Sequence, residues 1–153
     1  NREGESGPVF IKERAGREEE AMTGEELIRQ FERGETPAES FHHSDHVRLA
    51  FEYLLRFPII EALERFSGSI KRFATAHGKA DKYHETITWA YLFLIRERMF
   101  RADQVQSWDE FSSQNHDLFV WKGGVLDRIY SPETLHSELA RIAFVLPDRH
   151  VSS

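Results

Sequence analysis

Histidines at the start of two apolar helical segments are the residues best suited to chemistry in this chain. His43 and His46 lie in the segment FHHSDH (residues 41–46), and His84 lies in the segment YHET (residues 83–86). Each segment opens a run with apolar residues at helical spacing. Neutral imidazoles on the facing sides of neighbouring helices are a usual way for a helical bundle to hold a transition metal. The pattern therefore predicts a mononuclear metal site at His43, His46 and His84.

The first two of these ligands come from a helix expected over residues 42–57. Because an α-helix turns by about 100° per residue, His43 falls close to the apolar stripe of this helix and His46 falls at its edge. His42 points instead toward solvent. The i,i+3 spacing of His43 and His46 places both imidazoles on neighbouring turns, within reach of one ion. His43 and His46 are therefore a better pair of metal ligands than His42 with either of them.

The third ligand comes from a helix expected over residues 82–100. His84 lies close to an apolar stripe that includes Tyr91, whereas Glu85 points away from that face. We therefore assign His84 to the metal, and Glu85 and Tyr91 to the catalytic role of assisting proton transfer. Two chain reversals separate the histidine-bearing helices, so that their N-terminal ends should lie at the same end of the bundle.

The absence of cysteine limits the metal ligands to histidine, carboxylate, tyrosine and backbone oxygen. Three imidazoles suit one divalent transition metal, Fe, Cu, Zn or Mn, and do not select among these ions. An enzyme with such a site would oxidise a small organic molecule or, as a second choice, hydrolyse one at an open metal position. The alternative is a non-catalytic interaction or regulatory protein, in which the histidines are structural groups that cap helix starts.

Other spacings of histidine and carboxylate favour other sites less strongly. Glu39-x-x-His42 and Glu133-x-x-His136 have the E-x-x-H spacing of di-iron proteins, but neither faces a glutamate from a helix interior. His136 remains an alternative fourth ligand. The motif H-E-x-x-H is absent, which disfavours a zincin-type protease.

An aromatic cluster occupies the least regular part of the sequence. It consists of Trp108, Phe111, Phe119 and Trp121. These rings would form a lid over a pocket, a patch that binds a partner, or ordinary core packing. Ordinary packing is the favoured interpretation.

The helical pattern predicts an all-α fold, a bundle of four main helices with one or two short ones. We expect residues 1–21 to form a mobile acidic leader and residues 22–153 to form a single helical-bundle domain. The sequence TGEE at residues 23–26 is a capping box, and Asp81 is the expected cap of the central helix. A last helix should turn Leu135, Leu139 and Ile142 inward.

Composition limits the kinds of partner that the protein can bind and the cellular compartment in which we expect it. The chain has 153 residues and a formal net charge of −6, and residues 1–36 carry 6 Lys/Arg against 10 Asp/Glu, a balance of −4. The body is thus near neutral and lacks a basic patch, which disfavours nucleic acid as a partner. No apolar run approaches the roughly 20 residues of a membrane span, and no secretory signal is visible. We expect a cytoplasmic protein whose partner is a small-molecule substrate.

Three segments resemble a family of small bacterial helical proteins that is uncharacterised. They are F-x-H-x-x-H-x-x-x-A at residues 41–50, YHET at residues 83–86 and SPETL at residues 131–135. The resemblance would cover residues 38–148, and it implies the same histidine set and no particular activity. The architecture is also similar to metal-binding bundles of the DinB type, which use three histidines. This chain departs from their order, since two histidines come first and one follows.

Overall fold

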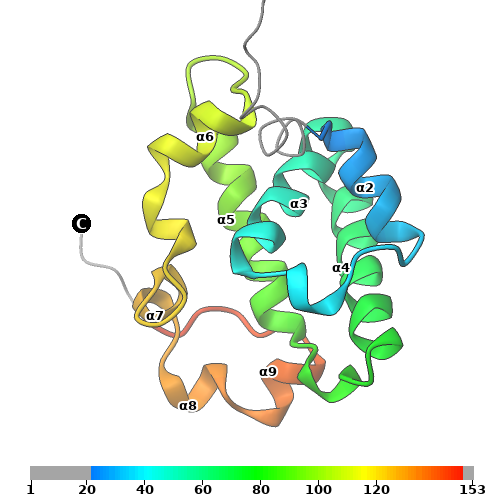
Figure 1. Cartoon of the computed structure of the whole chain (residues 1–153). Coiled ribbons are helices and arrows are strands. Elements are labelled where there is room, and N and C mark those ends of the chain that lie inside the picture. Colours follow the sequence, from blue (N-terminus) through cyan, green and yellow to red (C-terminus); the bar gives the residue numbers. More distant parts are fainter. Residues whose placement is uncertain (1–21, 150–153) are drawn as a thin grey trace, which may run out of the picture.

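The computed structural model describes residues 22–149, and the expected leader at residues 1–21 lies outside the described residues. The described residues form helices and no strand, which confirms the all-α class (Figure 1). None of these helices has the length and apolar character that crossing a bilayer requires. The α-helices are α2 (Gly24–Glu32), α3 (His43–Arg56), α4 (Ile59–Ala76), α5 (Glu85–Arg101), α6 (Trp108–Gln114), α7 (Val125–Ile129), α8 (Pro132–Leu135) and α9 (Glu138–Ile142), and the 3-10 helices are η1 (Ala38–Ser40), η2 (Ala80–Lys82) and η3 (His116–Phe119).

The three long helices α3, α4 and α5 pack against one another and carry much of the core. Tyr53 and Phe51 of α3 and Leu92 of α5 are fully buried. Helix α2 packs on α3 and α4, and α9 packs on the N-terminal part of the molecule's central helix α5. Figure 1 shows α6 and α7 on the side of α5 away from α4. The long helices therefore form the scaffold on which any site is built.

Local capping signals set several helix starts, as the sequence predicts. The Thr23 hydroxyl accepts from the backbone N–H of Glu26 at 3.1 Å, and the Glu26 carboxylate accepts from the Thr23 N–H at 3.2 Å. Ser107 and Glu110 make the same reciprocal pair at the start of α6. Both capping boxes satisfy backbone N–H groups that have no partner inside the helix.

The start of α5 differs from the prediction. Asp81 does not cap this helix, because residues 80–82 form η2 and α5 begins only at Glu85. The cap is His84, whose Nδ1 accepts from the backbone N–H of Ile87 at 3.1 Å. A histidine predicted to bind metal thus has a capping role, which is the alternative that the sequence left open.

The prediction of a single last helix is wrong, because this segment forms two short helices, α8 and α9. Ser137 begins α9 by accepting from the backbone N–H of Ala140 at 3.1 Å. The resulting change of direction leaves Leu139 62% exposed and Ile142 59% exposed, whereas Leu135 is buried. The apolar spacing of these three residues is continuous in sequence but not in space.

After α9 the chain runs in an extended path beside α5. Thr86 fixes this segment, since its hydroxyl donates to the carbonyl of Ala143 at 2.9 Å and accepts from the N–H of Val145 at 3.1 Å. Further along, the Asp148 carboxylate accepts from the backbone and hydroxyl of Ser131 at the start of α8. The C-terminal part of the described chain therefore ties the short helices to α5.

Candidate functional site

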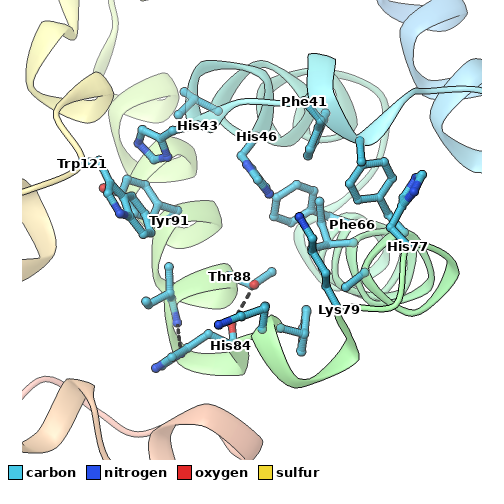
Figure 2. Close-up of a pocket in the computed structure, with 18 residues that line it drawn as sticks. Phe41, His43, His46, Phe66, His77, Lys79, His84, Thr88, Tyr91 and Trp121 are labelled. Atoms are coloured by element: carbon cyan, nitrogen blue, oxygen red, sulfur yellow. Dashed lines mark hydrogen bonds between the residues drawn. The ribbon is translucent and has the colours of Figure 1, made fainter.

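A cavity of about 410 Å³ lies between α3, α4 and α5 (Figure 2). All three histidines predicted from the sequence line it, together with His77. Its walls are otherwise largely aromatic and aliphatic. The lining residues are Ala38, Phe41, His43, His46, Val47, Phe66, Ile70, Phe73, Ala74, His77, Lys79, Lys82, Tyr83, His84, Ile87, Thr88, Tyr91 and Trp121.

His46 presents an unpaired nitrogen to this cavity. Its Nδ1–H donates to the carbonyl of His42 at 3.2 Å, which leaves the lone pair on Nε2. No described residue forms a hydrogen bond with Nε2, and Figure 2 shows the ring extending from α3 into the cavity. Burial lowers the pKa of His46 to about 4. The ring is thus a neutral hydrogen-bond acceptor near pH 7.

His43 connects α3 to η3. Its Nε2–H donates to the carbonyl of Leu118 at 2.8 Å, and burial lowers its pKa. The ring packs against two aromatic side chains, with its centroid 5.0 Å from that of Tyr91 and 4.9 Å from that of Trp121. His43 therefore belongs to an aromatic wall of the cavity.

Both ring nitrogens of His84 are used by the fold. Nδ1 accepts from the N–H of Ile87, and Nε2–H donates to the carbonyl of Leu135 at 2.7 Å. Burial lowers the pKa of His84, which keeps the ring neutral near pH 7. Neither nitrogen has a free lone pair in this arrangement, so that His84 acts as a cap and as a link to α8.

The three predicted ligands share a cavity but do not form a cluster. His43 contacts Tyr91, which lies seven residues after His84 and so about 10 Å further along α5. Helix α3 thus begins level with the interior of α5 and not with its first turn. Within residues 22–149, no group of three or more His, Cys, Asp or Glu side chains is arranged to hold a metal ion. The metal assignment has no support from this geometry and stays a prediction.

The two residues predicted to assist proton transfer have different surroundings. Glu85 is not among the residues that line the cavity, and its carboxylate accepts from the Tyr83 hydroxyl at 2.5 Å. Tyr91 does line the cavity. Burial, with the negative charges of Asp127 and Asp117, raises the pKa of Tyr91 to about 12. Its hydroxyl therefore keeps its proton and can serve as a hydrogen-bond donor.

Sequence reasoning missed the two lysines at the cavity. Lys79 and Lys82 come from the connection between α4 and α5, where Gly78 has a φ of 69° that reverses the chain. Neither lysine forms an ion pair with another described residue. Lysines in a short connection are normally solvated, so that only the helix-ending glycine signals that the chain turns back over the end of α4.

A second cavity of about 350 Å³ lies on the other side of the aromatic wall. It shares Ile87, Tyr91 and Trp121 with the first cavity and continues to Asp127 of α7. His136, the alternative fourth ligand, lines this second cavity and not the first. The structure therefore separates His136 from the predicted histidine set.

The aromatic cluster of residues 108–121 has two parts. Phe111 is fully buried, and the ring of Trp108 packs on Phe51 at 5.4 Å, which agrees with ordinary core packing. Trp121 is 55% exposed and lines both cavities. The interpretation of a lid thus fits Trp121 alone.

The chain matches no family model, no curated protein and no solved structure. The resemblance to the bacterial helical family and the similarity to DinB-type bundles therefore stay predictions. Function has to be argued from the cavity itself.

Proposed function

We propose that the protein binds a small, largely apolar molecule in the cavity between α3, α4 and α5. A volume of about 410 Å³ lies in the range of sites for small molecules, about 300–1,000 Å³. Such sites combine apolar and aromatic walls with a few polar groups that orient the ligand. This cavity has that composition, with Phe66, Ile70 and Phe73 on the α4 side and Tyr91 and Trp121 opposite.

The observation that carries the proposal is the open Nε2 of His46. The ring of His46 is half-buried and held neutral by its surroundings, and its Nε2 is reachable from the cavity as a hydrogen-bond acceptor. No described residue supplies a donor at Nε2. A ligand hydroxyl would donate to this nitrogen while its apolar body fills the space between the aromatic walls.

This proposal favours the binding class over the metalloenzyme. Oxidation or hydrolysis was predicted from a metal at His43, His46 and His84, and in this arrangement His84 already uses both nitrogens. His46 contributes a neutral acceptor to the cavity without any metal. This group can orient a ligand that carries a hydroxyl.

Isothermal titration calorimetry with 2-naphthol, a neutral apolar probe with one hydroxyl, tests the proposal. We expect saturable binding to the wild type. Ala74→Trp, which fills the cavity from α4, should abolish it, whereas Ala76→Trp on an exposed site of the same helix should not. His46→Phe should weaken binding about tenfold, since one buried hydrogen bond is lost. Equal affinity in the wild type and Ala74→Trp would contradict the proposal.

A further inference from the structure

We infer that the ligand of this cavity is an apolar molecule with a carboxylate at one end, and that Lys79 pairs with the carboxylate. The inference rests on the proposed binding function and names the class of ligand. In its simplest form the ligand is a hydroxyaryl carboxylate, with the hydroxyl on His46 and the carboxylate at the α4–α5 connection.

The charges around the cavity have one sign. Among the described residues that line it, Lys79 and Lys82 are the charged side chains, and no aspartate or glutamate is present. Burial keeps His43, His46 and His84 neutral near pH 7. A cavity with apolar walls and charges of one sign concentrates the opposite charge. The chemistry of the lining thus favours an anion over a neutral or cationic ligand.

The backbone around Lys79 is fixed, although the residue itself is exposed. Its N–H donates to the carbonyl of Ala74 at 2.7 Å, which folds the connection back over the end of α4. The N–H of Lys82 donates in turn to the carbonyl of Lys79 at 2.8 Å. Figure 2 shows the Lys79 side chain extending into the cavity on the side toward which His46 points. The two polar contacts of one ligand would therefore be made from opposite walls, one from α3 and one from the α4–α5 connection.

A carboxylate fits this arrangement better than a larger anion. Figure 2 shows Lys79 extending into the cavity, and most of the remaining lining is aromatic and aliphatic. The ammonium group of Lys79 balances one carboxylate, whereas a phosphate dianion held by Lys79 alone would keep an unpaired charge against apolar surface. The aromatic rings of Phe41 and Phe66 then cover the body of the ligand.

Lys71 is a matched control for Lys79. It lies in the C-terminal part of α4, before the connection that carries Lys79, but its ammonium group sits over the ring of Tyr83 at 5.1 Å and it does not line the cavity. Lys71→Met and Lys79→Met therefore remove the same charge from the same region of the surface. Only the second change removes a group from the cavity.

Calorimetry with 2-naphthol, 6-hydroxy-2-naphthoate and 6-(aminomethyl)-2-naphthol tests the inference on the full chain. We expect the carboxylate to bind about tenfold more tightly than 2-naphthol and the amine to bind more weakly than 2-naphthol. Lys79→Met and Lys79→Gln should remove the advantage of the carboxylate, and Lys71→Met should keep it. Circular dichroism of each variant checks that the fold is intact.

The outcomes separate the inference from the proposed function. If 2-naphthol and the carboxylate bind equally well, the inference fails and the binding function stands. A preference for the carboxylate that survives in both Lys79 variants would overturn the role of Lys79. If none of the three probes binds, the proposed function fails, and the inference fails with it.

Discussion

Two polar side chains of helix α3, Glu52 near its C-terminal end and His46 near its N-terminal end, differ in how completely they are hydrogen-bonded. Near its C-terminal end, the carboxylate of Glu52 is 4% exposed and accepts from Arg48 at 3.3 Å and from Arg56 at 2.7 Å. Near its N-terminal end, the ring of His46 is paired on one nitrogen and open on the other. In the Glu52 cluster, made of Glu52, Arg48 and Arg56, the carboxylate has both of its partners. The ring of His46 has a partner on one nitrogen only.

The difference shows how a structural polar group can be told from one available to a ligand. The partners of Glu52 come from its own helix, one turn before and one turn after, so the cluster is satisfied as soon as α3 forms. The cavity is lined by an acceptor at His46 and a cation at Lys79. A buried polar group whose partners are all present serves stability, whereas one that faces open space can serve binding.

Removal of Glu52 should have the largest effect on stability. Glu52→Ala leaves two arginines without their shared buried partner, and we expect the free energy of unfolding to fall by about 2–3 kcal/mol. Glu61→Ala, which breaks the exposed i,i+4 pair with Arg65, should cost less than about 0.5 kcal/mol. Denaturant unfolding of both variants measures the difference. Equal losses would show that the Glu52 cluster is no more than a surface pair.

The second largest effect is expected for His84→Ala. The free energy of unfolding should fall by about 2 kcal/mol, because the helix cap and the hydrogen bond to Leu135 are lost together. His136→Ala, on an exposed neighbouring site, should change stability by less than about 0.5 kcal/mol. Elemental analysis of the wild type and of the three histidine variants tests the metal prediction. One equivalent of metal in the wild type that is lost in His43→Ala, His46→Ala and His84→Ala would establish the three-histidine site and contradict the structural role of His84.

Acid should destabilise the cavity through His46. Its pKa falls from 6.5 in the unfolded chain to about 4 in the fold. Between these values the unfolded chain binds more protons, so the stabilisation is fully present above pH 6.5 and is lost as the pH falls toward 4. From pH 6.5 to pH 5 we expect His46 to account for a loss of about 1–2 kcal/mol. Thermal unfolding across this range should show a shallower slope for His46→Gln than for His116→Gln, an exposed control.

The smallest effect concerns a glycine packed on the Glu52 cluster. A Cβ at Gly24 would lie 1.9 Å from the Glu52 carboxylate oxygen, so Gly24→Ala should destabilise by about 1 kcal/mol despite the higher helix propensity of alanine. At Gly68 in α4, the nearest atom is the flexible end of Arg72 at 3.3 Å. Gly68→Ala should therefore be neutral or stabilising. If both variants gain stability, the Glu52 cluster is looser than its hydrogen bonds indicate.

The features that depend on local sequence could be predicted, because helix periodicity and capping act within a few residues. The capping boxes at Thr23 and Ser107 and the inward positions of His43 and His46 belong to this group. The three histidines line one cavity, although α3 begins level with the interior of α5 and not with its first turn.

The use of each ring nitrogen could not be predicted, because it depends on distant carbonyl groups. His43 bonds to Leu118, 75 residues away, and His84 bonds to Leu135, 51 residues away. No local pattern encodes such pairs. The inward position of Lys79 has the same origin, since it depends on how the connection after Gly78 folds over α4.

These long-range links to His43 and His84 also bear on the order in which the molecule is assembled. Helices α3, α4 and α5 leave the ribosome before residues 118 and 135 do, and N-terminal elements can associate during synthesis. The nascent chain can therefore form the part of the cavity between α3, α4 and α5 while the rings of His43 and His84 still lack their carbonyl partners. The first half of the chain supplies most of the cavity wall, and the second half, synthesised later, adds Trp121 and the carbonyl partners of His43 and His84.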